Sequence, residues 1–169
     1  LPTTKGFFSP KNIKDVHAYG VELNANTTFY WANNWSLSLN GTFSWTPSIN
    51  NGEPMSPADQ SVGKQLPYVP LYSASVNGKI SWKTFSFMYK WCYYSERYTM
   101  SSNDITLSGK LPTYFMSNIT IEKLLNFSWS DISIKFNINN LFNEEYMSVL
   151  SRPMPGINFQ LFLGITPKW

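Results

Sequence analysis

The sequence predicts an all-β protein: a segment of an antiparallel transmembrane β-barrel with about seven strands. Three observations support this prediction. Apolar and polar residues alternate along seven segments, each segment has about 10 to 13 residues, and short and long connections alternate between them. Alternation with period two is the pattern of a strand with one apolar and one polar face. The segments are longer than the usual strand of about 5 to 6 residues, and a tilted strand needs about 9 to 11 residues to cross a bilayer.

The first three segments cover residues 19–31, 35–45 and 71–82. In the second of them, WSLSLNGTFSW, large apolar residues occupy every second position except Gly41. Ser36, Ser38, Asn40, Thr42 and Ser44 lie between them. In a membrane barrel the apolar set, with Leu37, Leu39 and Phe43 at its centre, would face lipid and the polar set would face the lumen.

The other four segments cover residues 84–94, 113–122, 130–140 and 157–169. The third and the last of these four alternate well, although Phe162 breaks the pattern of the last. Alternation in 113–122 is weaker, with apolar residues at Phe115, Ile119 and Ile121. No segment fits helical spacing as well as period two, and no run of 18 apolar residues predicts a transmembrane helix.

The connections between these segments provide a second signal. Short links at 32–34, 83–84 and about 123–129 alternate with long ones at 46–69, 95–112 and 140–156. Outer-membrane barrels have short turns at one end and long loops at the other, whereas a sandwich mixes loop lengths. Aromatic residues flank both kinds of connection, as in the interfacial girdles of such barrels.

The number of strands indicates that this chain is part of a larger barrel. Bacterial barrels close with an even number of strands, and an open sheet edge is very unfavourable in lipid. The chain also begins without a recognisable signal peptide, as expected if an upstream region has been removed. If the last strand ends on the periplasmic side, the loops 46–69, 95–112 and 140–156 are extracellular.

Five segments, in order, resemble the C-terminal end of TonB-dependent outer-membrane receptors. They are AYGVELNANTTF, GKQLPYVPLYSASVNGKISW, ERYTMSSNDITLSGKLPTYFMSNITIE, INNLFNEEYM and RPMPGINFQLFLGITPKW. The resemblance implies a barrel of about 22 strands that is plugged by an N-terminal domain. Residues 1–169 would be the C-terminal portion of that barrel, with the plug domain and earlier strands absent. The abundance of Asn, Ser and Tyr resembles receptors of Bacteroidota.

The same resemblance implies a function and a set of partners. It implies TonB-powered uptake of a scarce nutrient, such as a siderophore, haem, cobalamin or a glycan, across the bacterial outer membrane. The partners would be outer-membrane lipid, the rest of the barrel and its plug, TonB through the missing N-terminal region, and an unidentified small molecule. Trp169, at the end of an alternating strand, resembles the signal that the barrel-assembly machinery reads.

Candidate ligand-contacting residues are lumen-facing aromatics near the outer rim and residues of the loops. We select Tyr94, Arg97, Tyr98 and Arg152. These residues could instead have a structural role. The two tyrosines could belong to an aromatic girdle, and the two arginines could anchor the chain by their charge. His17 could ligate haem, but a position at the rim or surface explains it better. Asn143, Glu144 and Glu145 could bind a cation, but a solvated strand end explains these residues better.

The composition excludes several other functions. The net charge is +3 with scattered basic residues, so nothing predicts nucleic-acid binding. The one cysteine, Cys92, excludes an internal disulfide and a cysteine-rich metal site. We predict no enzyme, no cofactor and no metal site, because no catalytic arrangement is recognisable. The remaining alternatives are a passive pore or adhesin barrel and a soluble β-sandwich that binds glycans.

Overall fold

The computed structural model describes residues 15–106 and 108–168, and its main element is one seven-stranded antiparallel sheet. The strands are β2 (Val21–Trp31), β3 (Trp35–Trp45), β5 (Tyr72–Trp82), β6 (Phe85–Tyr94), β9 (Tyr114–Asn126), β10 (Ser130–Asn139) and β13 (Asn158–Pro167). Their order across the sheet is also their order in the sequence. Long strands that follow each other in the sequence are therefore neighbours in the sheet, and the prediction of seven long antiparallel strands is confirmed.

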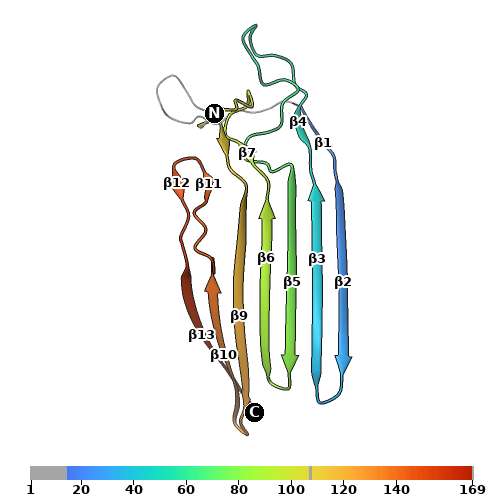
Figure 1. Ribbon diagram of the computed structural model, residues 1–169, viewed down its shortest axis with the longest axis vertical. Coiled ribbons are helices and arrows are strands. Elements are labelled where there is room, and N and C mark those ends of the chain that lie inside the picture. Colours follow the sequence, from blue (N-terminus) through green and yellow to red (C-terminus); the bar gives the residue numbers. More distant parts are fainter. Residues whose placement is uncertain (1–14, 107, 169) are drawn as a thin grey trace.

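The three short turns lie at one end of the sheet and the three long loops lie at the other (Figure 1). The turn between β2 and β3 is tight because Asn33 and Asn34 both have a φ of 63°, a conformation that asparagine adopts more readily than most residues. Lys83, in the next short turn, also has a positive φ of 50°. The predicted alternation of short and long connections is confirmed.

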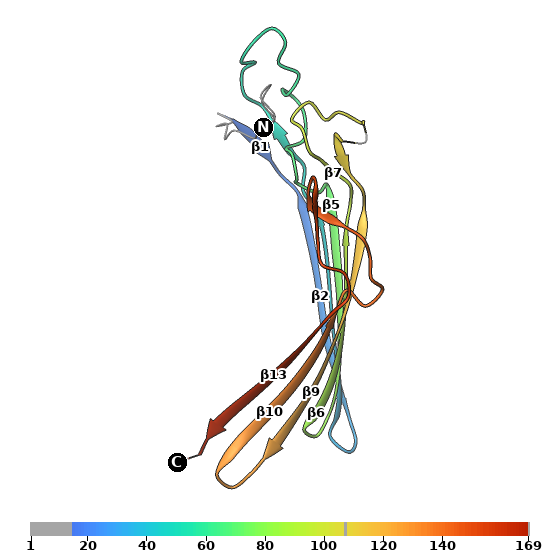
Figure 2. The same ribbon diagram turned by 90° about the vertical axis from the view of Figure 1, so that its left-hand side faces the viewer.

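The sheet is curved rather than flat. Seen from the side, β10 and β13 sweep away from the plane of the other strands (Figure 2). Among the described residues, β2 and β13 each pair along one edge only. The sheet is therefore an open arc of the kind that makes up part of a barrel wall.

Six short strands were not predicted from the sequence: one precedes β2, and the other five lie in the long loops. They are β1 (Val16–Ala18), β4 (Ser48–Asn50), β7 (Arg97–Tyr98), β8 (Lys110–Leu111), β11 (Met147–Val149) and β12 (Arg152–Pro153). They form three antiparallel pairs, β1 with β4, β7 with β8, and β11 with β12. Strands of two or three residues are too short to produce a detectable alternation.

Some predicted boundaries are wrong at both ends of the sheet. The connection expected at about 123–129 is a turn of only three residues, 127–129, because β9 continues to Asn126. Lys123 lies in an otherwise apolar row, between Phe85 and Ile134, and its charge ended the predicted strand too early. Its Nζ donates a hydrogen bond to Thr84 Oγ1 in the neighbouring turn, at 2.9 Å. At the other end of the sheet, β2 starts at Val21 rather than residue 19.

The described part of the chain has almost no buried apolar core. Of its large apolar or sulfur-containing side chains, only Cys92 and Leu111 are buried. On the edge strand β13, Leu161, Leu163 and Ile165 are 64%, 67% and 63% exposed. A soluble β-sandwich would need a second large sheet over this apolar face, whereas the other sheets of the described residues are pairs of strands with only two or three residues. No helix in this part of the chain has the length and apolar character to span a membrane.

Candidate binding surfaces: the polar face and the outer rim

Strand register separates the sheet into an apolar face and a polar face. One row on the apolar face runs across six strands as Leu37, Ile80, Phe87, Ile121, Phe136 and Leu161. The adjacent row on the polar face runs as Ser38, Lys79, Met88, Thr120, Asn137 and Gln160. Because successive side chains of a strand point to opposite faces, this pairing places the two rows on opposite sides of the sheet.

Asparagine side chains form a hydrogen-bonded row on the polar face. Asn40 donates to Asn26 Oδ1, and Asn77 donates to Asn40 Oδ1 at 3.1 Å. These three residues come from β3, β2 and β5, so the row links three neighbouring strands. Each asparagine carries both a donor and an acceptor, which allows such a row to continue from strand to strand.

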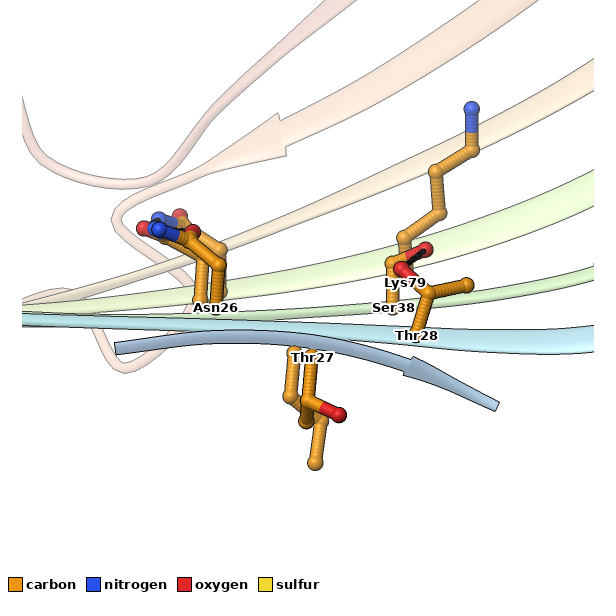
Figure 3. A pocket seen from close by; sticks show the side chains of 8 residues that line it. Asn26, Thr27, Thr28, Ser38 and Lys79 are labelled. Carbon is orange, nitrogen blue, oxygen red and sulfur yellow. Dashed lines mark hydrogen bonds between the residues drawn. The ribbon is translucent and has the colours of Figure 1, made fainter. Parts of the chain in front are cut away.

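A shallow groove of about 170 Å³ lies beside this row. Its polar lining includes Thr28, Ser38 and Lys79 in addition to the three asparagines. Figure 3 shows Asn26, Thr28, Ser38 and Lys79 on one side of the sheet and Thr27 on the opposite side. Thr28 Oγ1 donates to Ser38 Oγ at 3.2 Å. Thr27 and Leu39 complete the lining, so the groove combines hydroxyl, amide and ammonium groups with apolar carbon surface.

Aromatic rings gather at both ends of the strands. Next to the short turns, Trp35 stacks on Trp82 with ring centroids 5.7 Å apart, and Phe127 stacks on Trp129 at 5.9 Å. Near the long loops, Trp91 stacks on Phe115 at 5.8 Å, and Phe43 stacks on Tyr72 at 6.3 Å. This placement agrees with two aromatic girdles at the membrane interfaces.

Three tyrosines and one arginine form a cluster at the outer end of the polar face, which we call the tyrosine–arginine cluster (Tyr94, Arg97, Tyr114 and Tyr146). Tyr94 and Tyr114 stack with centroids 5.1 Å apart, and Tyr114 and Tyr146 stack at 4.7 Å. The Arg97 guanidinium carbon lies 4.8 Å from the centroid of the Tyr114 ring. Tyr94 and Tyr114 face each other across β6 and β9.

Arg97 is only 5% exposed. Burial lowers the pKa of its guanidinium from the ordinary value, and the neighbouring Tyr114 partly opposes that shift. The group remains charged, because an arginine in a protein does not lose its proton. Its Nη2 donates to the carbonyl oxygens of Pro112 and Met147, each at 3.3 Å. Backbone carbonyl oxygens of two different loops therefore accept hydrogen bonds from the buried Arg97 guanidinium.

The other predicted residues lie apart from this cluster. Tyr98 belongs to β7, and Lys110 Nζ lies 5.9 Å from its ring centroid. Arg152 is exposed on β12. His17 lies on β1 opposite Ile49, with its ring 5.2 Å from that of Tyr19. Trp169 lies outside the described residues. The four ligand-contact candidates are therefore not all brought together, and their role stays a prediction.

Tyr114 and Tyr146 were not among the residues predicted from the sequence. The pairing of β6 with β9 could have predicted Tyr114, because the strand beside β6 must place some residue opposite Tyr94. Tyr146 lies in a loop, where no periodic pattern predicts contacts. The described residues contain no group of three or more His, Cys, Asp or Glu side chains that could hold a metal ion.

Comparisons with known proteins agree with this geometry. Residues 1–141 match the family model described as "TonB dependent receptor-like, beta-barrel". The fold resembles BauA, the ferric preacinetobactin receptor of Acinetobacter baumannii, with a TM-score of 0.60 and 10% identity, over 90% of this chain and 27% of that one. It also resembles FyuA, the ferric yersiniabactin uptake receptor of Yersinia pestis, with a TM-score of 0.52 and 21% identity, over 91% of this chain and 24% of that one.

The chain thus spans about a quarter of the length of the two solved receptors, 27% and 24%. No curated protein matches it.

Proposed function

The chain belongs to the TonB-dependent receptor β-barrel family of the bacterial outer membrane, and from this membership we propose that it forms part of a barrel that imports a scarce nutrient. The observation that carries the proposal is the family match over residues 1–141. The curved antiparallel sheet, with its exposed apolar face and its polar opposite face, supports the same conclusion. Members of this family are receptors and transporters, in agreement with the prediction that the chain is not an enzyme.

In this proposal the apolar face contacts lipid and the polar face lines the lumen. The three loops that follow β3, β6 and β10 lie outside the cell, and the short turns lie in the periplasm. The rest of the barrel, a plug domain, TonB and the barrel-assembly machinery are the proposed protein partners. Trp169 is the residue through which we expect the assembly machinery to recognise the chain.

The proposed ligand is a small molecule that diffuses poorly through general pores: a siderophore, haem, cobalamin or a glycan. The polar groove beside Asn40 favours a ligand with hydrogen-bonding groups, because amides and hydroxyls line it. Near the outer rim, Tyr94, Tyr98 and Arg152 are the proposed contacts. Arg97, which is 5% exposed, would act indirectly, by holding Tyr114 where it stacks on the proposed contact Tyr94.

Uptake by cells that produce the full-length receptor tests this function. Cells with and without TonB receive iron-loaded hydroxamate and catecholate siderophores, haemin, cyanocobalamin or maltooligosaccharides, each radiolabelled. We expect one of these compounds to accumulate only when both the receptor and TonB are present. Accumulation that requires the receptor but not TonB would instead indicate a passive pore.

A planar-bilayer recording provides the matching control. A plugged receptor should show little steady ion conductance, whereas a passive pore conducts continuously. A continuously open channel, together with no TonB-dependent accumulation of any compound in the panel, would contradict the proposed function.

A further inference from the structure

The loop between β6 and β9, residues 95–113, lies at the centre of a set of contacts among all three long loops. We call the loops at 46–71, 95–113 and 140–157 the first, second and third outer loops. Each contact between them joins residues far apart in the sequence. The Arg97–Met147 hydrogen bond spans 50 positions, and the Gln65–Asn103 hydrogen bonds span 38. If these contacts are stable, the three loops open and close together as one unit. If they are not, each loop moves separately.

Arg97 joins the second outer loop to the third. Its Nη2 donates to Pro112 O within its own loop and to Met147 O in the third outer loop. Its guanidinium also lies against the ring of Tyr114, which stacks on Tyr146 of the third outer loop. A planar guanidinium can stack on a ring and donate hydrogen bonds in its own plane at the same time, which an ammonium group cannot do.

Asn103 joins the second outer loop to the first. The backbone N–H of Gln65 donates to Asn103 Oδ1 at 2.9 Å, and Asn103 Nδ2 donates back to Gln65 O at 2.8 Å. The side chain of Asn103 thus pairs with the backbone of Gln65 as a neighbouring strand would. A backbone hydrogen bond of 2.7 Å, from Tyr68 N to Tyr98 O, supports the same contact.

From these contacts we infer that Arg97 is a positioning residue that holds the third outer loop against the second, and that with Asn103 it makes the three outer loops one preformed unit. This inference goes beyond the proposed function and does not depend on the identity of the ligand. Because Arg97 is almost fully buried, its removal leaves the carbonyls of Pro112 and Met147 without their donor, and such groups are costly to leave unpaired. The expected consequence is local opening of the loops rather than unfolding of the sheet.

Hydrogen exchange of the full-length receptor in detergent tests the inference at two amides. The Met154 amide donates to Tyr146 O within the third outer loop at 3.0 Å, and the Tyr68 amide donates across the contact between the first and second loops. In Arg97→Ala we expect exchange at Met154 to become about tenfold faster or more, which corresponds to about 1.4 kcal/mol of lost protection. Exchange in the centres of β5 and β6 should not change.

Three further variants make the test specific. Asn103→Ala should accelerate exchange at Tyr68 and leave Met154 unchanged. Lys110→Ala, which removes the partly exposed Lys110–Glu96 ion pair in the same loop, should change neither amide. Arg97→Lys retains the charge but not the fork of donors. We therefore expect exchange at Met154 to become faster than in the unmodified receptor, by a smaller factor than in Arg97→Ala. If Arg97→Ala does not assemble, Arg97→Lys and Tyr146→Leu serve in its place.

The inference is overturned if the faster exchange in the Arg97 variants is confined to the second outer loop, residues 95–113. It is also overturned if Lys110→Ala affects the Met154 amide as strongly as the Arg97 variants do. Neither result depends on ligand uptake, so the positioning role and the proposed transport function can fail independently.

Discussion

At the scale of single residues, adjacent positions of one strand should respond in opposite ways to the same substitution. Leu39 lies on the apolar face between Thr27 and Gly78, whereas Asn40 lies on the polar face between Asn26 and Asn77. Leu39→Arg is expected to lower the free energy of unfolding by about 2 to 4 kcal/mol, because it places a charge in the apolar layer. Asn40→Arg breaks amide contacts next to water and should cost about 1 kcal/mol.

Chemical unfolding of the full-length receptor in liposomes measures both free energies. The two substitutions introduce the same side chain one residue apart, so each controls for the size and charge of the other. Equal losses would contradict the assignment of the two faces.

A pair of glycines offers a second comparison at the residue scale. A Cβ on Gly20 would overlap the backbone oxygen of Trp45, whereas a Cβ on Gly41 would meet nothing within 4 Å. Gly20→Ala should therefore destabilise the protein by about 1 to 3 kcal/mol, as overpacking does. Gly41→Ala should change stability by less than about 0.5 kcal/mol. Denaturant midpoints compare the two variants. A larger loss of stability for Gly41→Ala would contradict the close approach of Gly20 to the backbone of Trp45.

The residue scale also shows where prediction from sequence succeeds. Alternation placed Tyr94 on the polar face, and its pairing with Ser73 and Tyr114 agrees. Alternation did not predict that Arg97 is buried beside Tyr114, because the partners of Arg97 come from another strand and another loop. Contacts of this kind depend on how distant segments meet.

At the scale of elements, the two kinds of connection should differ in accessibility from outside the cell. The first outer loop exposes Met55 at 68%, and its neighbours in the sequence are exposed as well. A short epitope inserted after Met55 should be tolerated and should bind antibody on intact cells, because insertions are best accepted at exposed loop positions.

The same epitope inserted after Lys83, in the short turn between β5 and β6, serves as the control. It should bind antibody only after the outer membrane is permeabilised. Flow cytometry of intact and permeabilised cells measures both, and antibody binding to the second insertion on intact cells would contradict the proposed orientation.

The long strands could be predicted and the short ones could not. Seven segments of about ten or more residues repeat the two-residue period often enough to be recognised. The pairs β1–β4, β7–β8 and β11–β12 contain strands of only two or three residues. Lys123 misled the prediction of one boundary because its charge in the apolar row is stabilised by Thr84, which lies 39 positions away.

At the scale of the whole molecule, the unpaired edges of the arc predict how this chain behaves by itself. Among the described residues, β2 and β13 have no strand on their outer sides, and each unpaired backbone group costs several kcal/mol in lipid. Residues 1–169 expressed alone should therefore not form a folded species that resists SDS. The full-length receptor should do so, and gel mobility with and without heating compares the two. A heat-modifiable band from the isolated segment would contradict this expectation.

The sequence by itself determined the strands, their two faces and the alternation of short and long connections. These features follow from a local rule, since neighbouring side chains of a strand point to opposite sides wherever the strand lies. Only the tertiary structure decided that Tyr114 and Tyr146 stack and that Arg97 and Asn103 connect three loops. Those features depend on contacts between residues up to 50 positions apart, and no local pattern in the chain encodes them.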